Sequence, residues 1–241
     1  MTRATLCILC LLINLSLSAQ NIVDKEGAVV RSDTLYKSIK LCFTGHDYDE
    51  GFDHVLRILK KHKVEGSFFL TGDFVRSHKR LVKTIAKQGH FVGAHSDKHL
   101  LYCDWTNRDS LLHSTEKIKN DILQNLLALK QLGIHPKYFM PPYEWHNKKV
   151  VEIASGLNQT TINFSYGTRS NADYTTPDMP NYTSSKAILK SIYDYESLKG
   201  MNGFHLLIHP GTSPKRKDKF YFHLDTLIAT LKEKGYQFSK F

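Results

Sequence analysis

The sequence has few cysteines and no internal repeats, and each absence excludes a class of protein. Four cysteines occur among 241 residues, and two of them, Cys7 and Cys10, lie in the apolar stretch at the N-terminus. That leaves Cys42 and Cys103, too few for a scaffold held by disulfides, and we expect two buried free thiols. The lack of repeats and low-complexity tracts excludes solenoid and collagen-like architectures.

Long apolar runs are also scarce, and the one that exists begins the chain. A short start with the basic Arg3 precedes residues 4–17, which are nearly all apolar, and small residues follow up to Ala19. This pattern is typical of a secretory signal peptide and is short for a membrane span. We expect a signal peptide at residues 1–19, one domain at residues 20–241, no membrane span in the mature chain, and export to the periplasm or the medium.

Acidic residues are outnumbered, since 33 Lys and Arg face 23 Asp and Glu, a net charge of +10. A basic surface can bind nucleic acid, aid solubility or attract acidic polymers. The sequence lacks a helix-turn-helix pattern, zinc-finger spacing and an RNA-binding aromatic motif, so we expect no nucleic-acid partner. We expect the protein to be a monomer.

Strand and helix patterns alternate along the chain. Strands are predicted at residues 39–43, 66–70, 91–94, 137–140, 161–164 and 204–208, and helices at residues 52–63, 77–88, 114–132 and 222–234. This alternation predicts an α/β fold of parallel βαβ units, either a barrel or a doubly wound sheet. In both folds the polar residues that follow the strands meet at one edge, where function usually resides.

Two histidines four residues apart, His95 and His99, follow the predicted strand at residues 91–94. One turn of helix would place both imidazoles on one face, and neutral imidazole is a common ligand of zinc. Since the chain has thirteen histidines, such a pair also arises by chance. Taken alone, it leaves metal binding open.

Histidines and carboxylates also follow other predicted strands. These segments are residues 43–51 (FTGHDYDEG), 140–145 (MPPYEW), 165–173 (SYGTRSNAD) and 206–211 (LLIHPG). The ordered set resembles the polysaccharide deacetylase family, whose pattern runs Phe-Asp-Asp-Gly, His-Ser-x-x-His, Arg-x-Pro-Tyr, an acidic segment and Leu-x-His. The resemblance covers residues 39–238, and residues 55–72 (VLRILKKHKVEGSFFLTG) are close to the family's text.

This resemblance implies a fold, a metal and a reaction. The fold is a distorted (β/α) barrel, and the reaction is hydrolysis of acyl groups on a carbohydrate by one divalent metal, typically zinc. His95 and His99 match the family's metal ligands, and His209 matches the histidine that protonates the leaving group. Tyr143 matches the tyrosine whose backbone N–H helps to hold the oxyanion.

The chain departs from the pattern at two places. Thr44 and Gly45 stand where the family has two aspartates, a catalytic base and a metal ligand, and Met140 replaces the arginine that pairs with the base. Losing both partners together is coherent, because a buried unpaired arginine would be costly. We predict a shifted pair in which Asp47 binds the metal, while His46 activates the water or binds the metal itself.

Other residues match the family pattern less closely, both as alternative metal ligands and as substrate contacts. Asp49 and Glu50 are alternate ligands, unless they only serve the start of the next helix. Asp173 with Arg169 is predicted to contact substrate and to replace the acidic segment that orients His209. Aromatic residues Tyr143, Trp145 and Trp105 are predicted to form a sugar platform, although such rings also serve as ordinary packing.

The resulting hypothesis is a metal-dependent hydrolase that removes N- or O-linked acetyl groups from an acetylated carbohydrate. One alternative is a carbohydrate-binding protein on the same barrel with impaired chemistry, which the altered residues 44–47 and Met140 favour. A second alternative is a hydrolase of a small amide or cyclic imide.

Export gives the first testable prediction. Because the small residues end at Ala19, protein recovered from the envelope or the medium should begin near Ala19 or Gln20 on N-terminal sequencing. Soluble cytoplasmic protein that keeps Met1 would contradict it.

Overall fold

The computed structural model describes residues 21–241, so the predicted signal peptide at residues 1–19 lies outside the described residues. The strands are β1 (Ile22–Val23), β2 (Val29–Arg31), β3 (Ser38–Gly45), β4 (Ser67–Leu70), β5 (Phe91–Ala94), β6 (Tyr138–Phe139), β7 (Thr160–Thr161), β8 (Phe204–Ile208) and β9 (Gln237–Phe238). The α-helices are α1 (Phe52–His62), α2 (Gly72–Ser77), α3 (Lys79–Lys87), α4 (Thr115–Lys130), α5 (Lys148–Ser155), α6 (Ser185–Lys199) and α7 (Leu224–Glu233). Short 3-10 helices span Pro142–Glu144, Ser170–Ala172 and Phe220–His223.

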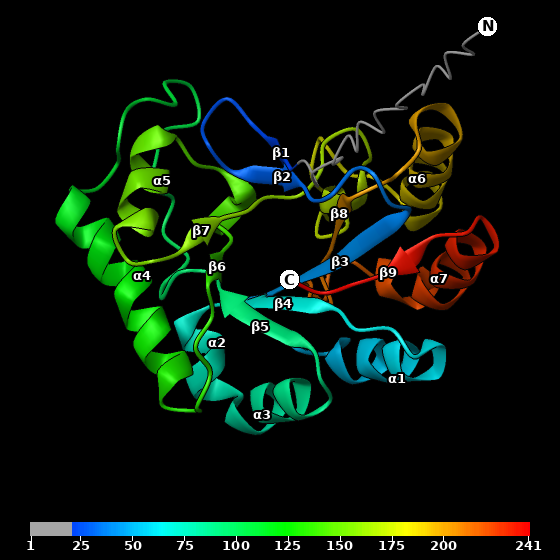
Figure 1. The fold of residues 1–241 in the computed structure, drawn as a ribbon, viewed down its shortest axis with the longest axis horizontal. Coiled ribbons are helices and arrows are strands. Elements are labelled where there is room, and N and C mark those ends of the chain that lie inside the picture. The colour runs from blue at the N-terminus through cyan, green and yellow to red at the C-terminus, as the bar shows by residue number, and fades with distance from the viewer. Residues whose placement is uncertain (1–20) are drawn as a thin grey trace, which may run out of the picture.

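The sheet curls around a centre, with helices on its outside (Figure 1). Its strand order is β1-β2-β8-β3-β4-β5-β6-β7, and β9 adds to β3. From β8 through β7 each neighbouring pair is parallel. The carboxyl ends of these strands therefore lie at one end of the curled sheet, as the alternating pattern predicts.

The segment that precedes β3 closes the curl into a distorted barrel. Strand β2 pairs antiparallel with β8, while Val29 also forms a parallel bridge to Ile162 just after β7. On the inner side of this joint the buried His205 ring contacts Ser32 Oγ at 2.7 Å and Asn163 O at 2.8 Å. This closure was not anticipated from the sequence, because β2 is only three residues long.

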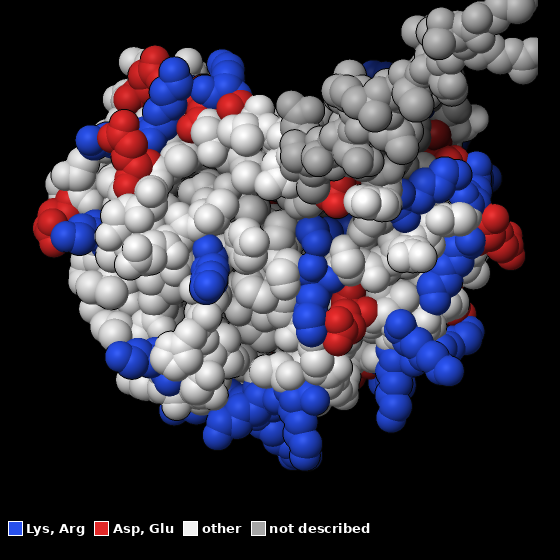
Figure 2. All heavy atoms as spheres, viewed as in Figure 1, with Lys and Arg blue, Asp and Glu red and all other residues white. Residues whose placement is uncertain are grey.

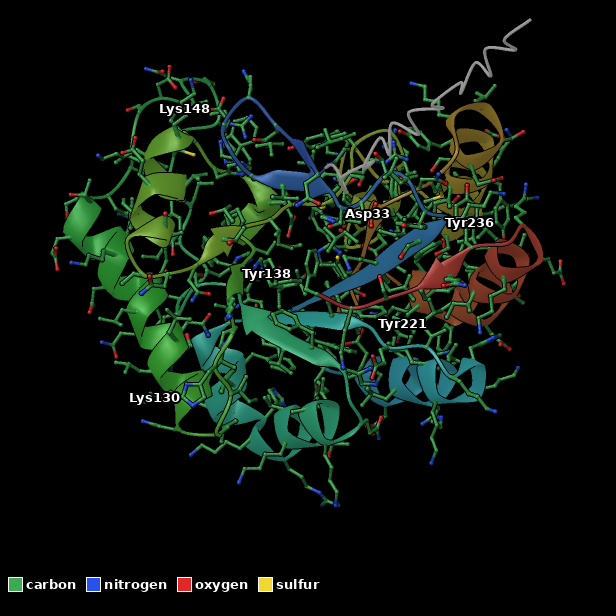
Figure 3. The ribbon with its side chains drawn as sticks, viewed as in Figure 1. Asp33, Lys130, Tyr138, Lys148, Tyr221 and Tyr236 are labelled. Carbon is green, nitrogen blue, oxygen red and sulfur yellow. The ribbon has the colours of Figure 1, made fainter. Side chains whose placement is uncertain are left out.

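The amino end of the barrel is filled by aromatic side chains. Phe91 of β5 and Tyr138 of β6 both pack against the ring of Phe241, and Figure 3 labels Tyr138. Figure 1 marks the C-terminus near the centre of the curled sheet. Since this end is packed with rings, access to the interior is left to the carboxyl end.

The helices cover the sheet with the apolar faces that their sequences predict. In α1 the buried residues Phe52, Val55, Leu56 and Leu59 recur at helical spacing, and the helix ends at Lys63, whose φ is 53°. The predicted helix at residues 77–88 is confirmed as α3, which begins after the non-helical backbone of His78, whereas α2 before it was not predicted. Helices α5 and α6 were not predicted, although Asn147 and Ser184 cap their N-termini.

Two expectations about composition can be followed in the structure. Cys42 and Cys103 are both buried and free, which confirms the prediction of two unpaired thiols. Lys and Arg side chains gather over α3, at the lower edge of Figure 2; among them Lys79, Lys83 and Lys87 line one shallow hollow. Within residues 21–241, the helices are too short or too polar to cross a bilayer.

The barrel joint gives a stability prediction. Ser165 Oγ donates to Val30 O at 2.5 Å and accepts from the His205 N–H at 2.8 Å, all in the buried interior. Ser165→Ala leaves Val30 O and the His205 N–H without this hydrogen-bond partner and should lower the free energy of unfolding by roughly 1–3 kcal/mol. At about 2–4 °C per kcal/mol for a domain of this size, thermal melting detects the loss. Ser197→Ala on the exposed side of α6 is the matched control, and equal melting of the two variants would contradict the prediction.

Candidate functional site

A cavity of about 570 Å³ lies at the carboxyl ends of the barrel strands. Its lining comes from the loops that follow β3, β5, β6 and β8 and from residues 174–179. The lining residues are Thr44, His46, Asp47, Tyr48, His99, Trp105, Tyr143, Glu144, Tyr174, Thr176, Asp178, Met179, His209, Gly211, Thr212, Ser213 and Lys215. Five of the predicted site residues, between positions 46 and 209 of the sequence, therefore line one cavity: His46, Asp47, His99, Tyr143 and His209.

His95 and His99 meet in the structure, but not through a turn of helix. Residues 95–99 form an irregular loop in which Ser96 and His99 have φ of 70° and 53°. The expected helical turn is wrong, because the Ser96 hydroxyl accepts from the His99 N–H at 3.0 Å and closes a local turn instead. The two rings still lie 5.0 Å apart, so the loop brings about the proximity that a helix was expected to give.

The His95 side chain is held in the form that binds a metal. Its Nδ1 lies 2.8 Å from Met140 O, which can only accept, so Nδ1 carries the proton and Nε2 keeps its lone pair. Metal-binding histidines usually donate their other N–H in this way. Burial lowers the pKa of His95 to about 3, and burial together with the adjacent His95 lowers the pKa of His99 to about 2. Both rings are therefore neutral at physiological pH.

The first divergent segment places His46 against this pair and leaves Asp47 toward solvent. The His46 ring stacks on His99 with centroids 4.3 Å apart, and His46 Nδ1 is buried without a hydrogen-bond partner among residues 21–241. Asp47 is 64% exposed, and its Oδ1 lies 3.2 Å from His46 Nε2.

The neighbouring carboxylates turn to other partners. Asp49 lies 3.2 Å from His78 Nδ1, and Glu50 accepts from Lys219 Nζ at 2.7 Å. A side chain at Gly45 would also be crowded, because its Cβ would lie 2.7 Å from Leu70 and 2.9 Å from Phe52. An aspartate in the family's ligand position thus does not fit this packing without movement of both neighbours.

His209 and Asp173 form a buried pair at the other wall of the cavity. Asp173 Oδ1 lies 2.5 Å from His209 Nδ1, and Asp173 Oδ2 accepts the backbone N–H of His209 at 2.8 Å. Burial opposes a charge on His209, but the charge and hydrogen bond of Asp173 outweigh burial and raise the pKa of His209. This arrangement orients the ring and leaves Nε2 as the atom that can deliver a proton.

Glu144 is a titratable residue of the cavity lining to which the sequence analysis gave no role. Its carboxylate Oε1 lies 4.0 Å from His95 Nε2, and its side chain is 10% exposed. Burial raises the pKa of Glu144 to about 7, while His209 opposes the shift and Asp173 adds to it. The residue stands directly after Tyr143, so its place in the segment that follows β6 was the available signal.

The aromatic residues gather at the mouth of the cavity. Trp105 and Tyr143 are 54% and 46% exposed, and their rings lie 5.8 Å apart. Trp145 packs behind Trp105, donates Nε1–H to Asp104 O and lies under the Arg108 guanidinium. The exposed pair presents flat apolar faces next to polar groups, a combination suited to a sugar ring.

Arg169, also predicted to contact substrate, lies outside the cavity lining. Its guanidinium donates to Thr183 Oγ1 at 2.5 Å. Asp173 is buried behind His209 rather than exposed to the cavity. The observed contact of each residue is therefore with the protein, and substrate contact stays a prediction.

The histidines at the strand ends are the candidate ligands for a divalent ion. Within residues 21–241, no three His, Cys, Asp or Glu side chains are already gathered closely enough to form a metal site. The His99 ring nevertheless contacts the rings of both His46 and His95, and His95 has the tautomer that leaves Nε2 free for a metal. The chemistry of these donors fits zinc or a similar ion, with His95 and His99 as its holders.

Comparison with known proteins connects this geometry to a family. A sequence model described as polysaccharide deacetylase matches residues 31–162. The Bacillus subtilis protein YlxY, of uncharacterised function, is 31% identical over 189 residues, which cover 78% of this chain and 51% of YlxY. This chain thus spans about half the length of that relative. The peptidoglycan-N-acetylmuramic acid deacetylase PdaA of Bacillus subtilis is 27% identical, over 90% of this chain and 75% of PdaA.

Solved structures agree with the fold. A pseudoenzyme of carbohydrate esterase family 4 from Bacillus anthracis aligns with a TM-score of 0.70 and 25% identity, over 89% of this chain and 67% of that one. The PdaA structure, a family 4 carbohydrate esterase, aligns with a TM-score of 0.67 and 25% identity, over 88% and 82%.

The sequence match covers more than half of the 241 residues, and the structural matches extend over nearly the whole described chain. Together with the barrel and the strand-end histidines, they confirm the resemblance seen in the sequence. The chain belongs to the polysaccharide deacetylase family and has that family's distorted α/β barrel.

Proposed function

We propose that the protein is a metal-dependent hydrolase that removes acetyl groups from a glycan. The observation that carries this proposal is one cavity lined by both His99 and His209, with His95 in contact with the His99 ring and Asp173 bonded to His209 behind the cavity wall. Cleavage of an acetyl group needs an activated water and a proton donor for the leaving group, and these two sets of side chains supply both needs.

The substrate class we propose is an N-acetylated glycan of the cell-wall type. Relatives named as peptidoglycan deacetylases support it, from Bacillus cereus at 26% identity and Bacillus subtilis at 27% identity. The exposed rings of Trp105 and Tyr143 provide a surface for the pyranose. The predicted export signal would bring the protein to the compartment where such a glycan lies.

Each site residue has a distinct role in this proposal. A bound zinc or similar divalent ion would acidify water and polarise the acetyl carbonyl. His209 donates a proton from Nε2 to the departing amine or hydroxyl, and Asp173 holds its ring in place. The Tyr143 backbone N–H stabilises the oxyanion, and His46 accepts the proton of the attacking water.

A second candidate is a carbohydrate-binding protein with little or no turnover. Thr44 and Gly45 in place of the aspartates, and Met140 in place of the arginine, favour it. So does the likeness to a structure described as a pseudoenzyme. The retained His209–Asp173 pair favours the enzyme, because a binding site has no use for a buried proton donor.

The first test of this function is removal of the histidine pair. His95→Ala and His99→Ala should each abolish tight binding of a divalent ion, because each removes one of the two neutral imidazoles. Elemental analysis after dialysis measures the ion, and acetate release from acetylated chito-oligosaccharides or peptidoglycan measures turnover.

Circular dichroism should show that both variants keep the fold, and His113→Ala, outside the cavity lining, should keep ion and activity. Variants that retain a stoichiometric ion would overturn the assignment of the pair. Wild-type protein that binds ion and glycan but releases no acetate would favour the second candidate instead.

Asp173→Asn tests the proton donor by its pH dependence. Asp173 raises the pKa of His209, so its loss should lower that pKa, and the alkaline limb of kcat should move to lower pH. The rate at the optimum should also fall, within the roughly 10²–10⁴-fold range of a disturbed proton-transfer group. Asp194→Asn on the exposed side of α6, outside the cavity lining, is the control that should leave the limb in place. An unmoved limb in Asp173→Asn would contradict the role of the pair.

A further inference from the structure

The site as assigned from the sequence lacks a well-placed carboxylate. A divalent ion held by two neutral imidazoles keeps its full charge, and catalytic zinc sites of the two-histidine type add a carboxylate. The family's aspartate position is Gly45, where a Cβ would crowd Leu70 and Phe52. A carboxylate ligand would therefore have to come from another part of the cavity wall.

The Glu144 side chain is in the required place. It lines the same cavity, is nine-tenths buried, and has Oε1 4.0 Å from His95 Nε2. Among residues 21–241 no group donates a hydrogen bond to this carboxylate. Buried carboxylates are otherwise paired or hydrogen-bonded, so an unpartnered one facing a histidine lone pair calls for a cation.

The backbone holds Glu144 in this position at an energetic cost. Tyr143 and Glu144 both lie in the left-handed region, with φ of 58° and 52°, where residues other than glycine are strained by about 1–3 kcal/mol. Asn163 Nδ2 donates to Glu144 O at 2.7 Å and fixes the strained segment from the neighbouring strand end. Such strain tends to persist where it positions a functional group.

The other nearby carboxylates are poorly placed by comparison. Asp47 is 64% exposed and contacts His46, while Asp49 and Glu50 are drawn to His78 and Lys219. None of these three contacts involves His95 or His99. Of the candidate carboxylates within residues 21–241, only Glu144 lies within 4.0 Å of a ring nitrogen of the histidine pair.

We propose that Glu144, rather than Asp47, is the carboxylate that holds the divalent ion together with His95 and His99. The inference rests on the metal dependence of the proposed function and moves the ligand from the loop after β3 to the loop after β6. Donors about 2.0–2.2 Å from a tetrahedral zinc lie roughly 3.4 Å apart. Small side-chain rotations would close the observed 4.0 Å.

The experiment compares ion binding in three single variants of the full mature chain. Metal-free wild type, Glu144→Gln, Asp47→Asn and the surface control Asp194→Asn, outside the cavity lining, are titrated with Zn²⁺ by calorimetry and with Co²⁺ by visible absorption. Glu144→Gln should weaken Zn²⁺ binding by more than the roughly 10–100-fold seen when an outer contact is lost, and should change the Co²⁺ spectrum. Asp47→Asn and Asp194→Asn should bind like wild type.

Thermal melting separates this effect from misfolding. Without metal, Glu144→Gln should melt at or above the wild-type temperature, because it removes a buried unpartnered carboxylate. With saturating Zn²⁺ the wild type should melt at a higher temperature, and Glu144→Gln should lose most of that increase.

The outcomes distinguish this inference from the function on which it rests. Wild-type protein that binds no divalent ion overturns the proposed metal dependence, and the inference with it. Tight binding by wild type and equally by Glu144→Gln overturns the inference alone. Loss of binding in Asp47→Asn but not in Glu144→Gln does the same and assigns the carboxylate to Asp47.

Discussion

The site depends on the position of β3 between two parallel neighbours. Its residues 42–45 pair with residues 67–70 of β4, and its residues 39–43 pair with 204–208 of β8. Because all three strands run the same way, the loops that follow them must open at one end of the barrel. Histidines separated by more than one hundred positions, such as His46 and His209, therefore line one cavity.

Burial then decides the chemistry of the residues gathered there. Desolvation keeps His95 and His99 neutral and ready to donate lone pairs, whereas an adjacent carboxylate keeps His209 ready to carry a proton. Histidine side chains in one site are thus held in opposite states, neutral at His95 and His99 and more readily protonated at His209. What differs between them is the partner: a backbone carbonyl for His95 and Asp173 for His209.

The departures from the family pattern also form a connected set. Gly45 is packed against Leu70 and Phe52, so the usual ligand position has no room for a carboxylate. Met140, in the place of the arginine, contributes its carbonyl oxygen to the His95 ring. Glu144 brings a buried carboxylate to the same ring from a strained turn. Within residues 21–241, the carboxylate nearest to the His95 ring nitrogen thus lies on the loop after β6 rather than at the end of β3.

The sequence by itself determined the main alternation of strands and helices, the family, and which histidines are proposed as metal ligands and proton donor. These rest on local periodicity and on short motifs with fixed spacing, which survive without knowledge of the packing. Only the tertiary structure decided which carboxylates approach the histidines, because Asp47 and Asp49 follow β3, Glu144 follows β6, and the direction of each side chain depends on backbone dihedrals. It likewise decided the barrel closure by β2, since a bridge between Val29 and Ile162 joins segments that no local pattern connects.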